Sequence, residues 1–206
     1  MRAALSFSMP LITELETRVM ALSARLLDTQ IQQEAEATFD PDIDGIAAFR
    51  LLVHAEIEDW IERCASESIS ELAKELATSA TLRTSSRLIV LSSLFAVELP
   101  FSLPFDEIKL RSQLSETLNR ARQFVKDNNG IKASSFCKVA MICGACLDEI
   151  DDALVQALNS YGTARGMVAH KSSQRVTTLL APSAEKNDAV NLIQLLKVFF
   201  GTIVPL

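Results

Sequence analysis

The sequence predicts an all-α protein, a bundle of about six to seven helices within a single domain of 206 residues. Apolar residues recur at steps of three and four along most of the chain, which is the spacing of one face of a helix. No segment shows the alternation of apolar and polar residues that a half-buried strand needs. Only six Gly and six Pro occur, too few for the many turns of an all-β fold.

Two long helices are predicted in the N-terminal part of the chain. The first covers residues 11–38, and its apolar face could pack within the chain or against a second copy. Asp40-Pro41-Asp42 interrupts the pattern, and Asp44 is suited to cap the second helix. An interruption of that helix is expected near residues 66–68. Its apolar stripe, which we expect in the core, is Ile46, Phe49, Val53, Ile57, Trp60, Ile61 and Cys64.

The middle of the chain predicts a pair of helices. The first of the pair runs from Arg87 to Val97 and ends before two prolines, at positions 100 and 104. Asp106 is a suitable N-cap for the other, which continues to Lys126. The segment after it, Asn-Asn-Gly at residues 128–130, is a strong signal for the end of a helix.

Three shorter helices are predicted after residue 130. Ser134 or Ser135 can cap a helix that runs to Ala145. The acidic residues at 148–152 favour the start of the next helix, because negative charge is stabilised at a helix N-terminus. The last helix is predicted over residues 188–200, with a glycine at 201 as its stop.

The chain carries no segment typical of export or of membrane insertion. Residues 1–8 are too short and too polar for a signal peptide, and no Arg-rich or Ser-rich transit segment is present. The longest uncharged apolar run, residues 198–206, is far shorter than a membrane span. We therefore expect a cytoplasmic protein with no membrane partner.

The four cysteines predict neither a metal site nor a cofactor. Cys143-Gly-Ala-Cys146 has the spacing of a redox motif, but no βαβ pattern surrounds it. Cys137 and a distant His are a poor set of further zinc ligands. Since disulfides are rare in the cytoplasm, we expect Cys64 and the other three thiols to be buried among apolar side chains.

The net charge of −6 disfavours general affinity for nucleic acid. The charge is unevenly distributed, because residues 1–103 carry 16 acidic and 8 basic side chains whereas residues 104–206 carry 10 and 12. An anionic ligand is therefore expected to meet the C-terminal half. For most of the basic side chains there, an ordinary solvated helix surface is the favoured interpretation.

One motif in this half combines two groups suited to phosphodiester chemistry. Residues 165–170 read Arg-Gly-Met-Val-Ala-His, so a guanidinium that binds phosphate precedes an imidazole that moves protons near neutral pH. Positions five apart differ by about 140° around a helix, so Arg165 and His170 do not stack. Either the Arg side chain reaches across or a second subunit completes the pair. The alternative is a surface Arg and a His favoured by the helix dipole.

Three segments in this order resemble a HEPN domain, most closely of the RiboL-PSP-HEPN type. They are Asn-Asn-Gly-Ile-Lys at 128–132, the short apolar helix after it, and Arg-Gly-x-x-Ala-His followed by Lys171 and Ser172. Residues 54–62 resemble the acidic, aromatic-bearing helix that begins the family's core. The resemblance covers about residues 45–180 of a single 1–206 domain. It leaves residues 1–44 and 183–206 as N-terminal and C-terminal helices packed on that core.

This resemblance implies a metal-independent endoribonuclease without a cofactor, acting as a homodimer with a composite active site. His170 would be the general acid or base and Arg165 would bind the scissile phosphate, giving a 2′,3′-cyclic phosphate and a 5′-OH. Lys171 and Arg175 would contact the RNA. The setting would be a defence or toxin–antitoxin system, with an antitoxin or an associated defence protein as a partner. The family often has Asn, Asp or His where this chain has Gly166, so a polar group that could orient the imidazole is missing.

His54 and Glu58 are candidate supporting residues. They are four apart on the second helix, which is equally the spacing of an ordinary surface pair. In the HEPN family a polar residue of this helix can approach the motif, so either could orient Arg165 or His170. Gly166 completes the candidate set, because glycine inside a helix costs about 1 kcal/mol relative to Ala and suggests a close approach there.

Two other functions remain open. The chain could be a non-catalytic HEPN module that binds RNA or a protein partner, which the Gly at 166 and the acidic net charge favour. It could also be a helical oligomerisation scaffold unrelated to RNA, in which Arg165 would be tied into an internal salt bridge.

Overall fold

The computed structural model describes residues 12–78, 82–100, 106–170 and 176–202, apart from the side chains of residues 82–85, 147, 170 and 202. Within these ranges the chain is helical, with connecting turns and without strands, which confirms the all-α prediction. Within them, too, no helix is both long enough and apolar enough to span a membrane.

The helices of the described ranges vary in length from three to 36 residues. In chain order they are α1 (Ile12–Leu26), α2 (Asp28–Gln33), α3 (Ile43–Thr78), α4 (Leu82–Leu94), α5 (Glu107–Lys126), α6 (Ala133–Ile142), the short 3-10 helix η1 (Leu147–Glu149), α7 (Asp152–His170) and α8 (Pro182–Thr202).

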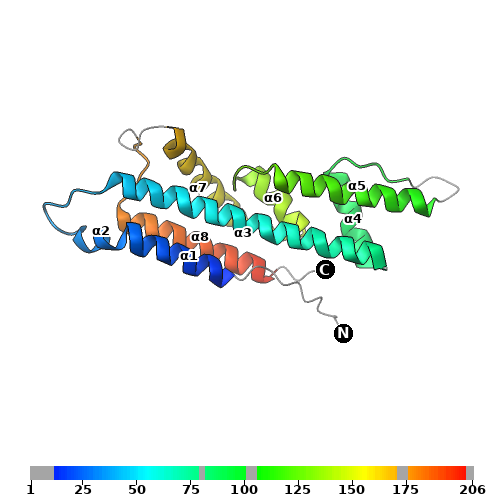
Figure 1. Ribbon diagram of the computed structural model, residues 1–206, viewed down its shortest axis with the longest axis horizontal. Helices are drawn as coiled ribbons and strands as arrows, with labels where there is room; N and C mark the ends of the chain where they lie inside the picture. The colour runs from blue at the N-terminus through cyan, green and yellow to red at the C-terminus, as the bar shows by residue number, and fades with distance from the viewer. Residues whose placement is uncertain (1–11, 79–81, 101–105, 171–175, 203–206) are drawn as a thin grey trace.

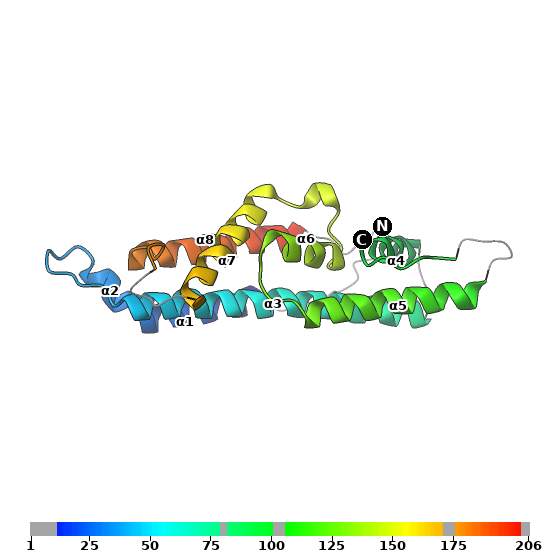
Figure 2. The ribbon, with the colours of Figure 1, turned by 90° about the horizontal axis from the view of Figure 1, so that it is seen from above.

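Helix α3 is the element around which the others are arranged (Figures 1 and 2). At 1.5 Å per residue its 36 residues span about 54 Å. Helices α1 and α8 run beside its first half and α7 crosses it obliquely, while α4, α5 and α6 gather along its second half (Figure 1). The first half of α3 therefore carries the residues that α7 can reach.

The predicted apolar stripe of α3 forms the core. Phe49 and Trp60 are buried, and the Trp60 ring meets Phe200 of α8 edge-to-face with 4.9 Å between ring centroids. The apolar face of α1 is buried as well, against α3 and α8 of the same chain. Of the two interpretations of that face, packing within the chain is the one observed.

Two predictions for the helices in the N-terminal part were wrong, and a specific hydrogen bond accompanies each difference. The first predicted helix is divided into α1 and α2, where the Ser23 hydroxyl donates to Asp28 Oδ1 at 2.6 Å. The second helix is not interrupted at residues 66–68. Ser68 is buried and its hydroxyl donates to the Ile142 carbonyl oxygen at 2.7 Å. A partner on α6 thus satisfies a side chain that would otherwise compete with the helix.

Boundaries elsewhere follow their capping residues. Asp106 caps α5 by accepting the Lys109 N–H, and the helix ends at Lys126 as predicted. Helix α4 ends three residues before the predicted position, and Ala96 just after it has a positive φ of 53°. Helix α8 begins six residues earlier than predicted, at Pro182, because proline suits the first position of a helix.

The expectation for the cysteines was only partly right. Cys64 and Cys143 are buried, and Cys137 is half-buried. Cys146 is exposed, because it lies in the turn between α6 and η1 rather than on a packed helix face.

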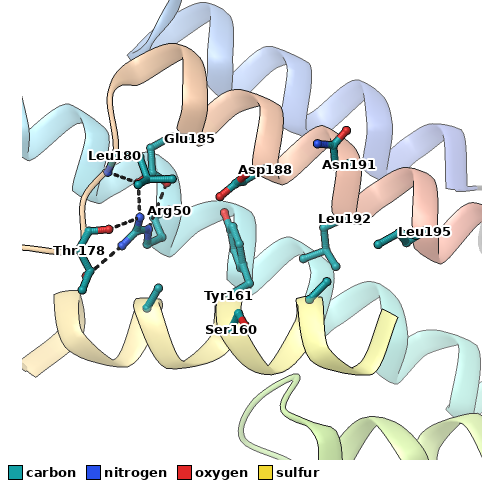
Figure 3. Close-up of a pocket in the computed structure, with 12 residues that line it drawn as sticks. Arg50, Ser160, Tyr161, Thr178, Leu180, Glu185, Asp188, Asn191, Leu192 and Leu195 are labelled. Carbon is teal, nitrogen blue, oxygen red and sulfur yellow. Dashed lines mark hydrogen bonds and ion pairs between the residues drawn. The ribbon is translucent and has the colours of Figure 1, made fainter. Parts of the chain in front are cut away.

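A buried ion pair joins the first half of α3 to α8 (Figure 3). Arg50 and Glu185 are only 3% and 1% exposed, and Arg50 also donates from Nη2 to the Thr178 carbonyl oxygen at 2.8 Å. Glu185 accepts the Leu180 N–H at 2.8 Å as well. The pair therefore fixes residues 178–180, the stretch that leads from α7 into α8.

We expect Glu185→Ala to lower the free energy of unfolding by about 3–5 kcal/mol, because it leaves the buried Arg50 charge without its partner. Urea unfolding followed by circular dichroism measures the change. Replacing both residues by apolar ones, Arg50→Met with Glu185→Leu, should restore a large part of the loss.

The matched control is Glu56→Ala, which breaks the Arg18–Glu56 pair on the surface, where Arg18 is 54% exposed. Exposed pairs contribute at most about 1 kcal/mol, so this variant should unfold close to the wild type. Equal losses for Glu56→Ala and Glu185→Ala would contradict the role given to the buried pair.

Candidate functional site

Three elements meet at the candidate site: α3, the turn between α5 and α6, and α7. Helix α3 contributes His54 and Glu58, the turn contributes Lys132, and α7 contributes Arg165. The charges of Arg165 and Lys132 both act on His54, so the four side chains share one electrostatic environment. We refer to His54, Glu58, Lys132 and Arg165 as the α3–α7 cluster.

The turn before Lys132 is built by its own sequence. Gly130 has a φ of 131°, in the region that favours glycine, which lets the chain reverse after α5. The side-chain amide of Asn128 donates to Glu62 Oε1 at 2.8 Å and to the Gly130 carbonyl oxygen at 3.1 Å. The turn is thereby held against α3, and Lys132 follows directly on it.

Gly162 allows α7 to approach this turn closely. A Cβ atom at position 162 would lie 3.2 Å from Lys132 Cγ and 3.7 Å from His54 Nε2. At Gly166, by contrast, a Cβ would meet no described atom within 4 Å. The close approach that we expected at Gly166 is therefore found one turn earlier, at Gly162.

His54 is an uncharged, buried member of the cluster. It is 2% exposed, and its Nδ1 lies 3.7 Å from Glu58 Oε2, within reach of an ion pair. Burial, followed by the charges of Arg165 and Lys132, lowers the pKa of His54 to about 4. At neutral pH this contact therefore joins a neutral imidazole to the carboxyl group. His54 and Glu58 do not form the ordinary surface pair that their spacing of four residues also allowed.

The pKa of Glu58 is also shifted by burial. Burial raises the pKa of its carboxyl group, as does the nearby charge of Glu62. The Gly130 backbone and the Arg165 charge act in the opposite direction and are weaker. A carboxyl group whose pKa is raised and that sits beside a cation is typical of functional sites.

Several buried polar atoms around the cluster lack hydrogen-bond partners among the described residues. They are His54 Nδ1, Glu58 Oε1, Asn128 Oδ1 and Arg165 Nε. Leaving such atoms unpaired costs about 1–3 kcal/mol each. Their concentration where three elements meet suits this region to the binding of a polar ligand.

The predicted site residues fall into two groups. Arg165, Glu58 and His54 lie in the cluster, as the supporting role given to Glu58 and His54 requires. His170 is the last residue of α7, and its side chain is outside the described part, as are Lys171 and Arg175. Because α7 is helical from 165 to 170, Arg165 and His170 keep their separation of about 140° around the helix.

Sequence reasoning did not assign a role to Gly162 or to Lys132. Both act through a contact between a turn and a helix 30 residues further along the chain, which spacing does not reveal. The glycine inside a helical pattern was the one available signal, because such a residue often marks a close approach.

The basic residues of the C-terminal half differ in their partners. Arg111 and Arg120 pair with acids one turn earlier on α5, and Lys186 and Lys197 pair with acids of α1 and α2. Arg165 and Lys132 form no ion pair with any described residue. Lys132 is exposed, so the solvated-surface interpretation fits it as well as the first four, whereas it fits the half-buried Arg165 less well.

Comparison of the chain with protein-family models, with curated proteins and with solved structures gives no match. Among the described residues, no group of three or more His, Cys, Asp or Glu side chains is placed to hold a metal ion. Function therefore has to be argued from the cluster itself.

The low pKa of His54 predicts a pH-dependent stability. The unfolded chain takes up a proton near pH 6.5, whereas folded His54 does so only near pH 4, so the unfolded state binds more protons between these values. The free energy of unfolding should fall, by on the order of 3 kcal/mol, as the pH is lowered through this window. Urea unfolding at several pH values measures it.

His54→Gln should remove this part of the pH dependence, because glutamine does not titrate. The raised pKa of Glu58 has the opposite sign, since the folded state then binds protons first and gains stability as the pH falls. That contribution remains in both proteins, so the difference between them isolates His54. Parallel curves for wild type and variant would show that folded His54 titrates normally.

Proposed function

We propose that the protein is a metal-independent endoribonuclease of the HEPN type. The observation that carries the proposal is Arg165, a half-buried arginine without an ion-pair partner among the described residues, on the helix that ends at His170. It lies beside a buried neutral histidine, a carboxyl group of raised pKa and a second unpaired cation. A phosphodiester offers the negative charge that such a site lacks.

In the proposed reaction His170 accepts the proton of the ribose 2′-OH, and the 2′-oxygen attacks the adjacent phosphorus. The bond from phosphorus to the 5′-oxygen breaks. That oxygen takes up a proton either from the same His170, now an imidazolium, or from a protonated His170 of the second subunit. Arg165 stabilises the negative charge that builds on the phosphoryl oxygens. The products are a 2′,3′-cyclic phosphate and a 5′-OH.

The remaining cluster residues have indirect roles in the proposal. His54 is only 2% exposed, so it acts from the protein interior rather than by touching RNA. Glu58 acts on the guanidinium through its charge alone, since no hydrogen bond or ion pair joins the two side chains. Gly166 leaves the surface of α7 open next to Arg165, because no described atom lies within 4 Å of where its Cβ would be.

A second subunit fits this proposal. Since Arg165 and His170 are about 140° apart on α7, a facing copy of the motif can bring an imidazole to the guanidinium of the first chain. The proposal therefore includes a homodimer with RNA between two motifs. An antitoxin or an associated defence protein would be the regulatory partner.

One observation favours a second candidate, a HEPN module that binds RNA or protein without cutting. Gly166 provides no polar side chain beside the motif to orient the imidazole of His170. A scaffold unrelated to RNA has less support, because the internal salt bridge of Arg165 that it called for is not found among the described residues.

Purified protein should cleave single-stranded RNA in the presence of EDTA, and Arg165→Ala and His170→Ala should each slow cleavage by about 100-fold or more. Mass spectrometry of the products should find cyclic phosphate ends. Equilibrium sedimentation should give about 45 kDa, twice the chain mass of 22.6 kDa.

The matched control is Arg122→Ala, which removes an exposed arginine of α5 that donates to Asn119 of the same helix. Its cleavage rate should equal that of the wild type. Undiminished cleavage by His170→Ala would exclude the proposed chemistry. Binding of RNA without cleavage at any protein concentration would favour the non-catalytic module.

Lys132 should contribute to RNA affinity through a phosphate contact. In the non-cleaving His170→Ala background, Lys132→Gln should weaken binding and reduce the slope of log K against log salt by about 0.7, the value for one phosphate of a single strand. Fluorescence anisotropy with a labelled oligonucleotide measures both quantities.

Lys138→Gln is the control, because the Lys138 ammonium already lies 5.2 Å from the centroid of the Phe124 ring. It should leave the salt slope unchanged. If both lysine variants lower the slope equally, the effect is one of net charge and not of the α3–α7 cluster.

A further inference from the structure

A cavity lies between α7 and α8, next to the buried Arg50–Glu185 pair (Figure 3). Its volume is about 340 Å³, at the lower end of the range of small-molecule sites. Helix α7 contributes Tyr161 and α8 contributes Asp188. The cavity has no part in the proposed cleavage of RNA, and a ligand can bind in it whether or not the protein cuts RNA.

The positive charge at the base of this cavity is already neutralised. Arg50 donates from Nε to Glu185 Oε2 at 3.1 Å and pairs with the other carboxylate oxygen as well. Its Nη2 also donates to the Thr178 carbonyl oxygen. The charge left over in the lining is the carboxylate of Asp188, an exposed residue that makes no hydrogen bond or ion pair with a described residue. The cavity therefore favours a cation and disfavours an anion.

Tyr161 supplies a buried polar atom at the same place. The residue is 7% exposed, yet its hydroxyl has no hydrogen-bond partner among the described residues. In Figure 3 this hydroxyl points into the cavity toward Asp188. Burial, and the nearby charge of Glu185, raise the pKa of Tyr161, so the phenol stays protonated at neutral pH and its oxygen is a neutral acceptor.

The rest of the lining is largely apolar. Leu180, Leu192 and Leu195 face the cavity together with two alanines of α7, Ala157 and Ala164. A ligand that fits these walls has a hydrocarbon or aromatic body in addition to its polar head. Asn191, at the exposed rim, offers a further amide oxygen.

We propose that this cavity binds a small organic ammonium compound, a primary amine with a short apolar body. The ammonium group donates hydrogen bonds to the Tyr161 hydroxyl oxygen and to the Asp188 carboxylate, and the body packs against the leucines. This arrangement gives the buried phenol oxygen a hydrogen-bond donor and pairs the exposed carboxylate with a cation. An alcohol of the same shape keeps the apolar contacts but loses the charge.

Isothermal titration calorimetry of the full chain with phenethylammonium tests the proposal, with 2-phenylethanol as the neutral isostere and 3-phenylpropionate as the anion. We expect saturable 1:1 binding of the amine, at least about tenfold tighter than that of the alcohol, because hydrogen bonds to charged groups are strong. We expect no binding of the acid, because its carboxylate has the same charge as that of Asp188. Asp188→Asn should weaken amine binding by about tenfold or more. Tyr161→Phe should weaken it by a smaller factor.

Asp148→Asn, which changes an exposed acid of η1 outside the cavity, is the control and should leave the affinity unchanged. Circular dichroism and thermal unfolding confirm that each variant is folded, and Tyr161→Phe keeps the ring that packs there. Absence of saturable binding by millimolar amine overturns the proposal. So does an affinity that Asp188→Asn leaves unchanged, or one that the alcohol matches.

Discussion

The ion pair between Arg50 and Glu185 is the interaction on which the rest of the structure depends. It joins α3 to α8 across 135 residues of sequence, and it also holds Thr178 and Leu180 in the connection between α7 and α8. Because Thr178 and Leu180 lie directly before Pro182, the pair fixes the start of α8 against α3. Helix α7 contributes Arg165 to the α3–α7 cluster, and the cavity with Tyr161 lies between α7 and α8 (Figure 3).

The second constraint is the contact of α7 with the turn that precedes α6. Gly162 has no side chain to separate them, so the stem of Lys132 and the imidazole of His54 reach the helix backbone. A side chain at position 162 would require the stem of Lys132 to move aside. The cost of a glycine inside a helix is therefore accompanied by close packing of α7 on this turn and on α3.

The sequence predicted those features that depend on residues nearby in the chain. It did not predict those that depend on contacts between distant segments. The helix from Asp106 to Lys126 follows from a cap and a stop that lie next to it in the chain. The continuity of α3 through Ser68 does not, because it depends on a carbonyl oxygen 74 residues away. The candidate site shows the same division. Arg165 stood out from its motif, whereas Lys132 acquires its place only when the turn folds onto α7.

Two arginines of this chain show how partners decide what a buried charge does. Arg50 is 3% exposed and bound by a carboxylate and a carbonyl oxygen, so its charge stabilises the fold and is not free for a ligand. Arg165 is half-buried, its Nε is unpaired among the described residues, and the carboxyl group nearest to it in the cluster has a raised pKa. The low pKa of His54 keeps its imidazole neutral at pH 7, so this histidine adds no charge to the cluster. A carboxylate as close to Arg165 as Glu185 is to Arg50 would remove its attraction for phosphate. The absence of such a partner among the described residues, rather than the spacing of the motif, is the physical reason to propose a ligand-binding role for Arg165.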